Sequence, residues 1–271
     1  MPRTSLPSTS RRRRATAVLG TLLTVGGLAV APPATGSAAT PTYTNAGKVH
    51  RWGLSQWHYG FTEAGLSSDW RVHVPDHVRL QHGMLTIDGS ADGRGGGARL
   101  TGHDRTVGRW ETRLRSRGYG TGHRPYHVIA TLAPTLGLGS HCGARELDLT
   151  KFMIGNQGAR TSIRNLPDLV DTFRVSLDAS GWHDYAVEVT DTHVKWFVDG
   201  QTAMTDTRPD ILTGVPVSVV FRLQGDPGKP AQQMNPARMQ MDWVRYYTLD
   251  RPDAAPSTGA APTRTSNPSA C

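Results

Sequence analysis

Two acidic residues in the middle of the chain have the spacing of a catalytic pair. The stretch 144–153, Ala-Arg-Glu-Leu-Asp-Leu-Thr-Lys-Phe-Met, alternates acidic and aliphatic side chains around Glu146 and Asp148. As a β-strand it places both carboxylates on one face and the leucines on the other. Carboxylates paired in this way can act as a nucleophile and as a general acid or base. The alternative is a solvated strand face, and the pattern alone leaves both interpretations open.

The elements that would position this strand are other short β-strands. Alternating runs recur between residues 49 and 249, separated by Gly, Asp, Asn and Pro, without an amphipathic helix. Asp199-Gly200 lies between two such runs and predicts a tight hairpin turn. The runs are 84–87, 108–115, 127–132, 185–189, 194–198, 215–223 and 239–247. This spacing predicts an all-β fold, a two-sheet antiparallel β-sandwich of the jelly-roll type.

The two ends of the chain differ in composition from this region. Residues 1–39 combine Arg11–Arg14 with an apolar run and a small-residue end, which is typical of a secretory signal peptide. The apolar run is too short and too rich in glycine for a membrane span. We therefore expect a secreted, extracellular protein without a membrane span after cleavage. Residues 40–48 are interpreted as a linker, and the Pro/Ala/Ser/Thr-rich residues 250–271 as a disordered tail.

The charge of the chain gives little support to nucleic-acid binding. The formal net charge of +8 comes from 30 Lys and Arg against 22 Asp and Glu. Five of the arginines lie in residues 1–39, which leaves 25 basic against 22 acidic residues, or +3. No GxSxG or HExxH motif is present, and the glycine-rich stretch 93–97 is not followed by Lys-Ser/Thr. We expect a monomer with no nucleic-acid partner.

Two cysteines, Cys142 and Cys271, remain in a chain that is predicted to reach an oxidising compartment. A flexible tail of about twenty residues spans on the order of 25 Å, so distance does not forbid a disulfide between them. The alternatives are two free thiols or an intermolecular bond through Cys271. A metal–thiolate site is not indicated, because the sequence has no CxxC or spaced His/Cys set.

Four segments together resemble glycoside hydrolase family 16, the β-jelly-roll group of β-glucanases, agarases and carrageenases. In chain order they are Val107–Arg113 (VGRWETR), Arg145–Asp148 (RELD), Trp182–Gly200 (containing WHDYAVEV and KWFVDG) and Met239–Tyr247 (MQMDWVRYY). The resemblance extends from Trp70 to Tyr247. It implies a sandwich of the concanavalin A-like lectin/glucanase type with a concave glycan cleft. It also implies secreted endo-β-glucanase-like hydrolysis of a β-linked polysaccharide.

The resemblance assigns roles to the acidic strand. Glu146 takes the position of the nucleophile, and Asp148 that of the aspartate that tunes it. The family's acid/base glutamate follows on the same face, four residues on in an unbroken strand or five after a β-bulge. Here these positions hold Thr150 and Lys151. A lysine ammonium, with a reference pKa of about 10.4, is a poor proton donor to a glycosidic oxygen.

Other positions correspond to binding sites of the family. Glu111 and Arg113 match sugar-contacting positions, and a cross-strand salt bridge is the alternative interpretation. Tyr126, Arg222 and Gln224 are further substrate-binding candidates, because alternation places them on neighbouring strands of the cleft.

The resemblance implies no required cofactor. Gly83 and Asp242 match positions where some members hold a structural calcium ion through a carbonyl and a carboxylate oxygen.

Three hypotheses follow for the function. The first is a polysaccharide hydrolase with Glu146 as nucleophile and a different proton donor. The second is a non-catalytic, lectin-like module that binds a polysaccharide in the same cleft. The third is a polysaccharide lyase on a similar sandwich, although the QIH and YFKAG motifs of alginate lyases are absent.

Overall fold

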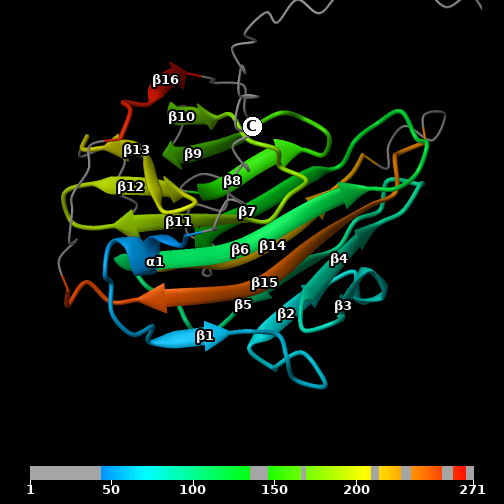
Figure 1. Cartoon of the computed structure of the whole chain (residues 1–271), viewed down its shortest axis with the longest axis horizontal. Helices are drawn as coiled ribbons and strands as arrows, with labels where there is room; N and C mark the ends of the chain where they lie inside the picture. The colour runs from blue at the N-terminus through cyan, green and yellow to red at the C-terminus, as the bar shows by residue number, and fades with distance from the viewer. Residues whose placement is uncertain are drawn as a thin grey trace, which may run out of the picture. The chain divides into compact units, whose positions relative to one another are not determined.

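Two antiparallel sheets face each other in the computed structural model (Figure 1). The structure describes residues 44–134, 146–165, 169–208, 214–226, 233–251 and 259–266. The predicted signal peptide, residues 1–39, therefore lies outside the described residues. No helix in the described ranges is long and apolar enough to cross a membrane.

The first sheet, called the β6 sheet, contains the longest strands. Its order is β13 (Gln201–Asp206), β12 (Val194–Val198), β11 (His183–Val189), β6 (Gly108–Gly118), β15 (Ala237–Tyr247), β4 (Leu85–Gly89) and β3 (Val78–Leu80). Strand β1 (Trp57–Tyr59) also pairs with β15, and a short 3₁₀ helix, η1 (Pro75–His77), precedes β3. All pairings in the sheet are antiparallel.

The second sheet, called the β8 sheet, carries the acidic stretch. Its order is β16 (Thr263–Ser266), β10 (Leu169–Val175), β9 (Ala159–Asn165), β8 (Leu147–Met153), β7 (His127–Pro134), β14 (Val217–Gln224), β5 (Gly97–Leu100) and β2 (Trp70–His73). The predicted all-β, two-sheet sandwich is confirmed. So is the hairpin turn between β12 and β13, where Asp199 and Gly200 both have positive φ, 48° and 76°.

The core between the sheets follows from strand alternation. Leu147 and Leu149 of β8 point inward and are 1% exposed. The fully buried large side chains that they join include Trp110, Tyr185 and Trp196 of the β6 sheet and Leu132 and Phe221 of the β8 sheet. Complete burial of a side chain such as leucine or phenylalanine contributes about 1.5–3 kcal/mol. The acids of β8 must then point to the opposite face of the sheet, which we call the open face.

The predicted linker 40–48 is wrong from residue 44 onward. Helix α1 (Ala46–Val49) is capped by the Asn45 side chain, which accepts a hydrogen bond from the Lys48 amide at 2.8 Å. Ala46 and Trp52 are buried against Phe197 and Tyr247 on the outer face of the β6 sheet. This short segment is ordered by tertiary packing, which composition does not reveal.

The prediction of a disordered tail over 250–271 is wrong for its described end. Strand β16 pairs antiparallel with the edge strand β10 (Figure 1). Arg264 donates to both carboxylate oxygens of Asp171 at 2.9 and 2.8 Å, and Asp171 is only 2% exposed. Because a buried carboxylate needs partners, this bidentate pair fixes the strand to the sheet edge.

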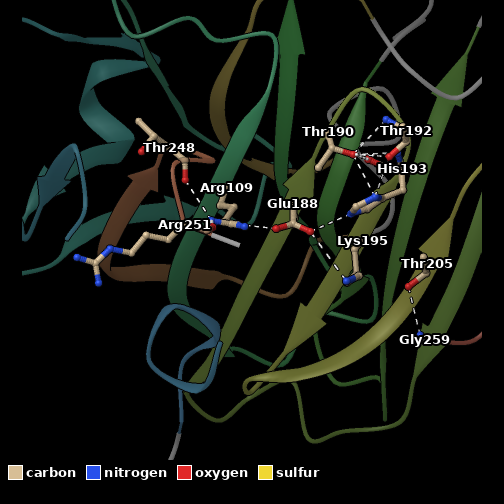
Figure 2. A network of polar contacts seen from close by, with 10 residues as sticks. All are labelled: Arg109, Glu188, Thr190, Thr192, His193, Lys195, Thr205, Thr248, Arg251 and Gly259. Atoms are coloured by element: carbon tan, nitrogen blue, oxygen red, sulfur yellow. Dashed lines mark hydrogen bonds and ion pairs between the residues drawn. The ribbon is translucent and has the colours of Figure 1, made fainter. Parts of the chain in front are cut away.

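A buried polar network links β6, β11 and β12 to the segment after β15 on the outer face of the β6 sheet (Figure 2). Arg109 donates to Glu188 at 2.5 Å and to the carbonyls of Thr248 and Arg251 at 3.2 and 2.7 Å. Lys195 Nζ lies 3.9 Å from the other Glu188 oxygen. Since Arg109 and Glu188 are both nearly fully buried, each charge depends on the other for compensation.

Replacement of Glu188 by glutamine should strongly destabilise the protein. The Glu188→Gln variant leaves the buried Arg109 and Lys195 without this carboxylate, which typically costs about 3–5 kcal/mol. Urea denaturation of the variant should show a lower midpoint than wild type. Glu63→Gln, the same change at an exposed position, is the control and should leave the midpoint nearly unchanged. Equal midpoints for the two variants would contradict the role given to the network.

Candidate functional site

Strand β8 contains a bulge of one residue. Its partners on β7 are Leu147 with Leu132, Asp148 with Thr131, Thr150 with Ala130, and Lys151 with Ile129. Leu149 has no partner in this ladder and is the extra residue. The insertion resets the alternation, so Asp148 and Lys151 point to the same face although three positions separate them. Lys151, five positions after Glu146, therefore takes the position on this face that follows the bulge.

A hydrogen bond from the opposite sheet supports the bulge. The indole nitrogen of Trp196 in β12 donates to the carbonyl of Asp148 at 3.0 Å, and Trp196 is completely buried. The Thr131 hydroxyl donates to the carbonyl of Leu147 at 3.1 Å. A bulge interrupts the regular ladder, so backbone groups beside it need other partners. These two contacts supply partners for the carbonyls of the two residues that precede Leu149.

The acidic strand opens onto a cavity of about 270 Å³ on the open face. Glu146, Asp148 and Lys151 line it together. The remaining lining residues come from the strands beyond β8: Arg160, Ser162 and Arg164 from β9, Val170, Thr172 and Arg174 from β10, and Thr265 from β16. The structure thus brings the three residues assigned to the catalytic strand into one site.

Each acid in this cavity already has a polar partner. Glu146 Oε1 accepts a hydrogen bond from Arg222 Nη2 at 3.3 Å, and its side chain is 25% exposed. Asp148 is 8% exposed, and its Oδ2 accepts a hydrogen bond from the Ser162 hydroxyl at 2.6 Å. Among the described residues, no carboxylate other than these two lines the cavity. The arrangement can bind charged or hydroxylated ligands, but the described lining contains no second glutamate of a retaining pair.

Arg222 and Gln224 lie on the open face of β14, as alternation predicts. Arg222 links the acidic cavity to two neighbouring cavities of about 340 and 430 Å³, both of which it lines. Gln224 lines the cavity of about 340 Å³. Their contact with a substrate stays a prediction.

The placement of Glu111 and Arg113 in the cleft is wrong. Both lie on the outer face of β6, in the sheet that does not contain β8. Glu111 is completely buried and accepts hydrogen bonds from the Gly47 amide and the Tyr247 hydroxyl, each at 3.1 Å. Arg113 forms a cross-strand ion pair with Asp242 at 2.9 Å, which matches the alternative interpretation. Alternation correctly predicts that Glu111 and Arg113 share one face of their strand, but it does not determine which sheet the strand belongs to.

Tyr126 is a core residue and no sugar platform. Its side chain is completely buried, and its hydroxyl lies 2.6 and 2.9 Å from the carbonyls of Ser90 and Arg94. The ring packs so closely on Gly89 that a Cβ there would come within 2.5 Å of it. Tyr126 immediately precedes β7, and its side chain packs into the core instead of lying on the open face.

The donors at Gly83 and Asp242 do not fit a calcium ion. Asp242 Oδ2 accepts a hydrogen bond from Arg113, so a guanidinium already compensates this carboxylate. Within the described part of the chain, no group of three or more His, Cys, Asp or Glu side chains could hold a metal. Gly83 serves the turn between β3 and β4, where its φ of +70° favours glycine. Cys142 and Cys271 both lie outside the described residues.

A second pair of buried acids lies beneath α1, away from the open face. Asp184 of β11 is 3% exposed, and its Oδ1 has no hydrogen-bond partner among the described residues. Burial, and then the nearby carboxylate of Glu111, raise the pKa of Asp184 to about 7. Burial likewise raises the pKa of Glu111. Neither group faces a cavity that holds the other site residues, so we place both outside the candidate site.

Replacement of Asp184 by asparagine should stabilise the protein at alkaline pH. The folded-state pKa of about 7 exceeds the ordinary value of 3.8, so the folded protein binds more protons between these values. The contribution of Asp184 to stability therefore falls as the pH rises from 3.8 to about 7. Asp184→Asn should be roughly 1–3 kcal/mol more stable than wild type at pH 8 and equal to it near pH 4. Denaturation at both pH values, with the exposed Asp191→Asn as control, measures this; a pH-independent difference would contradict it.

Sequence reasoning did not identify the basic residues of β9 and β10 as part of the site. Arg160, Arg164 and Arg174 line the acidic cavity, and Arg160 is the cross-strand partner of both Lys151 and Arg174. The signal was available in the alternation of Arg160, Ser162 and Arg164 at every second position. Only the register of the strands shows that these residues face the same cavity as the acids.

Comparison with solved structures identifies the fold. The laminarinase catalytic domain from Thermotoga maritima MSB8 aligns with a TM-score of 0.61 at 14% identity, covering 72% of this chain and 98% of that one. SCLam, a non-specific endo-β-1,3(4)-glucanase from family GH16, gives 0.60 at 17%, covering 72% and 91%. The endo-β-1,3-glucanase from Pyrococcus furiosus gives 0.58 at 14%, covering 72% and 94%.

The chain therefore has the sandwich fold of glycoside hydrolase family 16, as its sequence motifs suggest. At the level of sequence, no protein-family model and no curated protein matches it.

Proposed function

We propose that this chain is a polysaccharide-binding protein of the family 16 structural type that has lost efficient hydrolysis. The observation that carries the proposal is the position of Lys151 after the bulge, on the same face as Asp148 and in one cavity with Glu146. In the family this position belongs to the acid/base glutamate. The similarity of the fold to laminarinases and endo-β-glucanases supports a β-linked polysaccharide as the ligand.

The loss of hydrolysis follows from the chemistry of the retaining mechanism. One carboxyl must protonate the leaving oxygen and then, as carboxylate, activate the water that releases the glycosyl-enzyme. A lysine ammonium does neither well, because it holds its proton tightly and carries none of the required negative charge. Loss of general acid/base assistance typically costs about 10²–10⁴-fold in rate. Binding is not affected in the same way, since it needs only the cleft and its polar groups.

Residual hydrolysis is the second candidate function, and the two carboxylates favour it. Glu146 remains accessible from the cavity, and Asp148 stands two residues on with its hydrogen bond from Ser162. A nucleophile and its tuning partner are thus both present. In this case Glu146 attacks the sugar while solvent supplies the proton.

Replacement of Lys151 by glutamate tests the assignment. Lys151→Glu places a carboxyl at the position after the bulge, on the face of Asp148 and in the cavity of Glu146. Wild type should bind at least one member of a panel of neutral and anionic β-glycans and release little or no reducing sugar. The variant should release reducing sugar from at least one of these glycans, by a factor of about 10² or more over wild type.

The double variant Lys151→Glu/Glu146→Gln is the control for this gain, because it keeps the new acid and removes the nucleophile. Its activity should return to the wild-type level. Robust hydrolysis by wild type that survives Glu146→Gln would place the active site on other residues. Failure of wild type to bind any glycan of the panel would overturn the proposed function.

A further inference from the structure

The open face of the β8 sheet concentrates positive charge. The three cavities along it are lined by two carboxylates, Glu146 and Asp148, and by eight basic side chains: Arg71, Arg94, Arg99, Lys151, Arg160, Arg164, Arg174 and Arg222. This excess contrasts with the chain beyond residue 39, where 25 basic residues nearly balance 22 acidic ones. The excess of basic over acidic side chains is therefore specific to this face and does not follow from the composition of the chain.

Four of the basic residues form a line across the sheet, which we call the cationic row. Arg174 of β10 pairs in register with Arg160 of β9, and Arg160 with Lys151 of β8. Lys151 in turn stands opposite Ile129 of β7, which stands opposite Arg222 of β14. At about 4.8 Å per strand, the row extends roughly 19 Å from Arg174 to Arg222.

Most of this charge is not compensated within the described part of the chain. Arg222 pairs with Glu146, but Lys151, Arg160 and Arg174 have no carboxylate partner among the described residues. Like charges directly opposite each other on neighbouring strands destabilise a sheet. The arrangement recurs at the other end of the face, where Arg71 stands opposite Arg99. Such opposed cations are costly in the free protein and become favourable when an anionic ligand lies across them.

The positive field acts on a neighbouring group. His127 lies on the open face of β7, opposite Gln224 and Met153. Burial lowers the pKa of His127, and the charges of Lys151 and Arg160 lower it further. The effect of Lys151 and Arg160 on the pKa of His127 agrees with the register, which places all three residues on the same part of the open face.

The described lining of this face offers no side chain on which a neutral glucan would stack. Flat sugar rings pack their C–H faces on exposed aromatic rings. Among the described residues that line the three cavities, Phe221 is the only Trp, Tyr or Phe, and its side chain is completely buried in the core. The absence of exposed rings also disfavours single-stranded nucleic acid, whose bases stack on such rings. Guanidinium groups, which bind carboxylate and similar oxyanions through two parallel hydrogen bonds, take their place.

We infer that the open face binds an anionic polysaccharide, whose carboxylate or sulfate groups contact the cationic row of Arg174, Arg160, Lys151 and Arg222. The inference rests on the proposed function and specifies its ligand class. It also gives a reason for lysine at the position after the bulge. Lys151 continues the row between Arg160 and Arg222, where a glutamate would interrupt it.

Binding of charged and neutral polymers by the secreted protein tests this inference. Alginate provides carboxylates, carrageenan provides sulfate esters, and laminarin and lichenan are neutral; single-stranded DNA serves as a polyanion that is no glycan. At least one anionic glycan should bind about tenfold or more tightly than the neutral glucans, and its affinity should fall with added salt. The comparison of alginate with carrageenan distinguishes the two anionic groups.

Removal of charge from the row should weaken this binding selectively. Arg160→Gln/Arg174→Gln should lower affinity for the preferred anionic glycan about tenfold or more. Lys48→Gln/Arg117→Gln removes the same charge from the side of α1 and β6 and should change affinity less than about twofold. The row variant should melt at or slightly above the wild-type temperature, because opposed cations are removed. The control variant should melt at the wild-type temperature, because Lys48 and Arg117 are exposed. Lys151→Gln serves as a second row variant if the first fails to fold.

The outcomes separate this inference from the proposed function. Equal or tighter binding of neutral glucans, or equal loss of affinity in both double variants, overturns the anionic ligand and leaves polysaccharide binding standing. If single-stranded DNA binds as tightly as the best glycan, and if the row variant loses this binding as well, the face is a general polyanion site. That result also overturns the anionic polysaccharide as the specific ligand. Failure of every glycan to bind overturns both.

Discussion

The bulge at Leu149 is the constraint on which the site depends. In a regular strand Glu146, Asp148 and Thr150 would share the open face, and Lys151 would point into the core. The extra residue turns Thr150 inward and Lys151 outward, so a single insertion decides the charge of the site. The buried hydrogen bond from Trp196 to the Asp148 carbonyl ties this backbone irregularity to the opposite sheet. The core thus determines which side chain reaches the open face.

Charged side chains on the two sheets differ in burial and in pairing. On the outer face of the β6 sheet, Arg109 and Glu188 are buried and compensate each other. On the open face of the β8 sheet, arginines and a lysine stand opposite one another in partly exposed positions. A buried charge must be paired within the fold, because its desolvation is otherwise uncompensated. A partly exposed row is held in place by the ladder and keeps its charge available for a partner from solution.

Sequence reasoning succeeded where the information was local. Alternation around Glu146 and Asp148, the Asp199-Gly200 turn and the four family 16-like segments each depend on neighbouring residues, and they led to the observed sandwich. It failed where sheet membership or long-range pairing decides. Glu111 and Arg113 sit on the expected side of their strand but in the other sheet. Strand β16 depends on pairing with the distant edge strand β10 and on the contact with Asp171. The cationic row depends on the register of five strands, β10, β9, β8, β7 and β14.

The acids of β8 are compatible with an anionic ligand because the fold has already engaged them. Arg222 binds Glu146 at one end, and Ser162 donates to the largely buried Asp148. Each carboxylate thereby loses part of its repulsion toward a negative polymer. Glu146 at the same time holds the Arg222 guanidinium over the sheet, at the point where the apolar Ile129 interrupts the row. On this account the carboxylate of Glu146 works as a positioning residue for Arg222 in the anion binding that we infer.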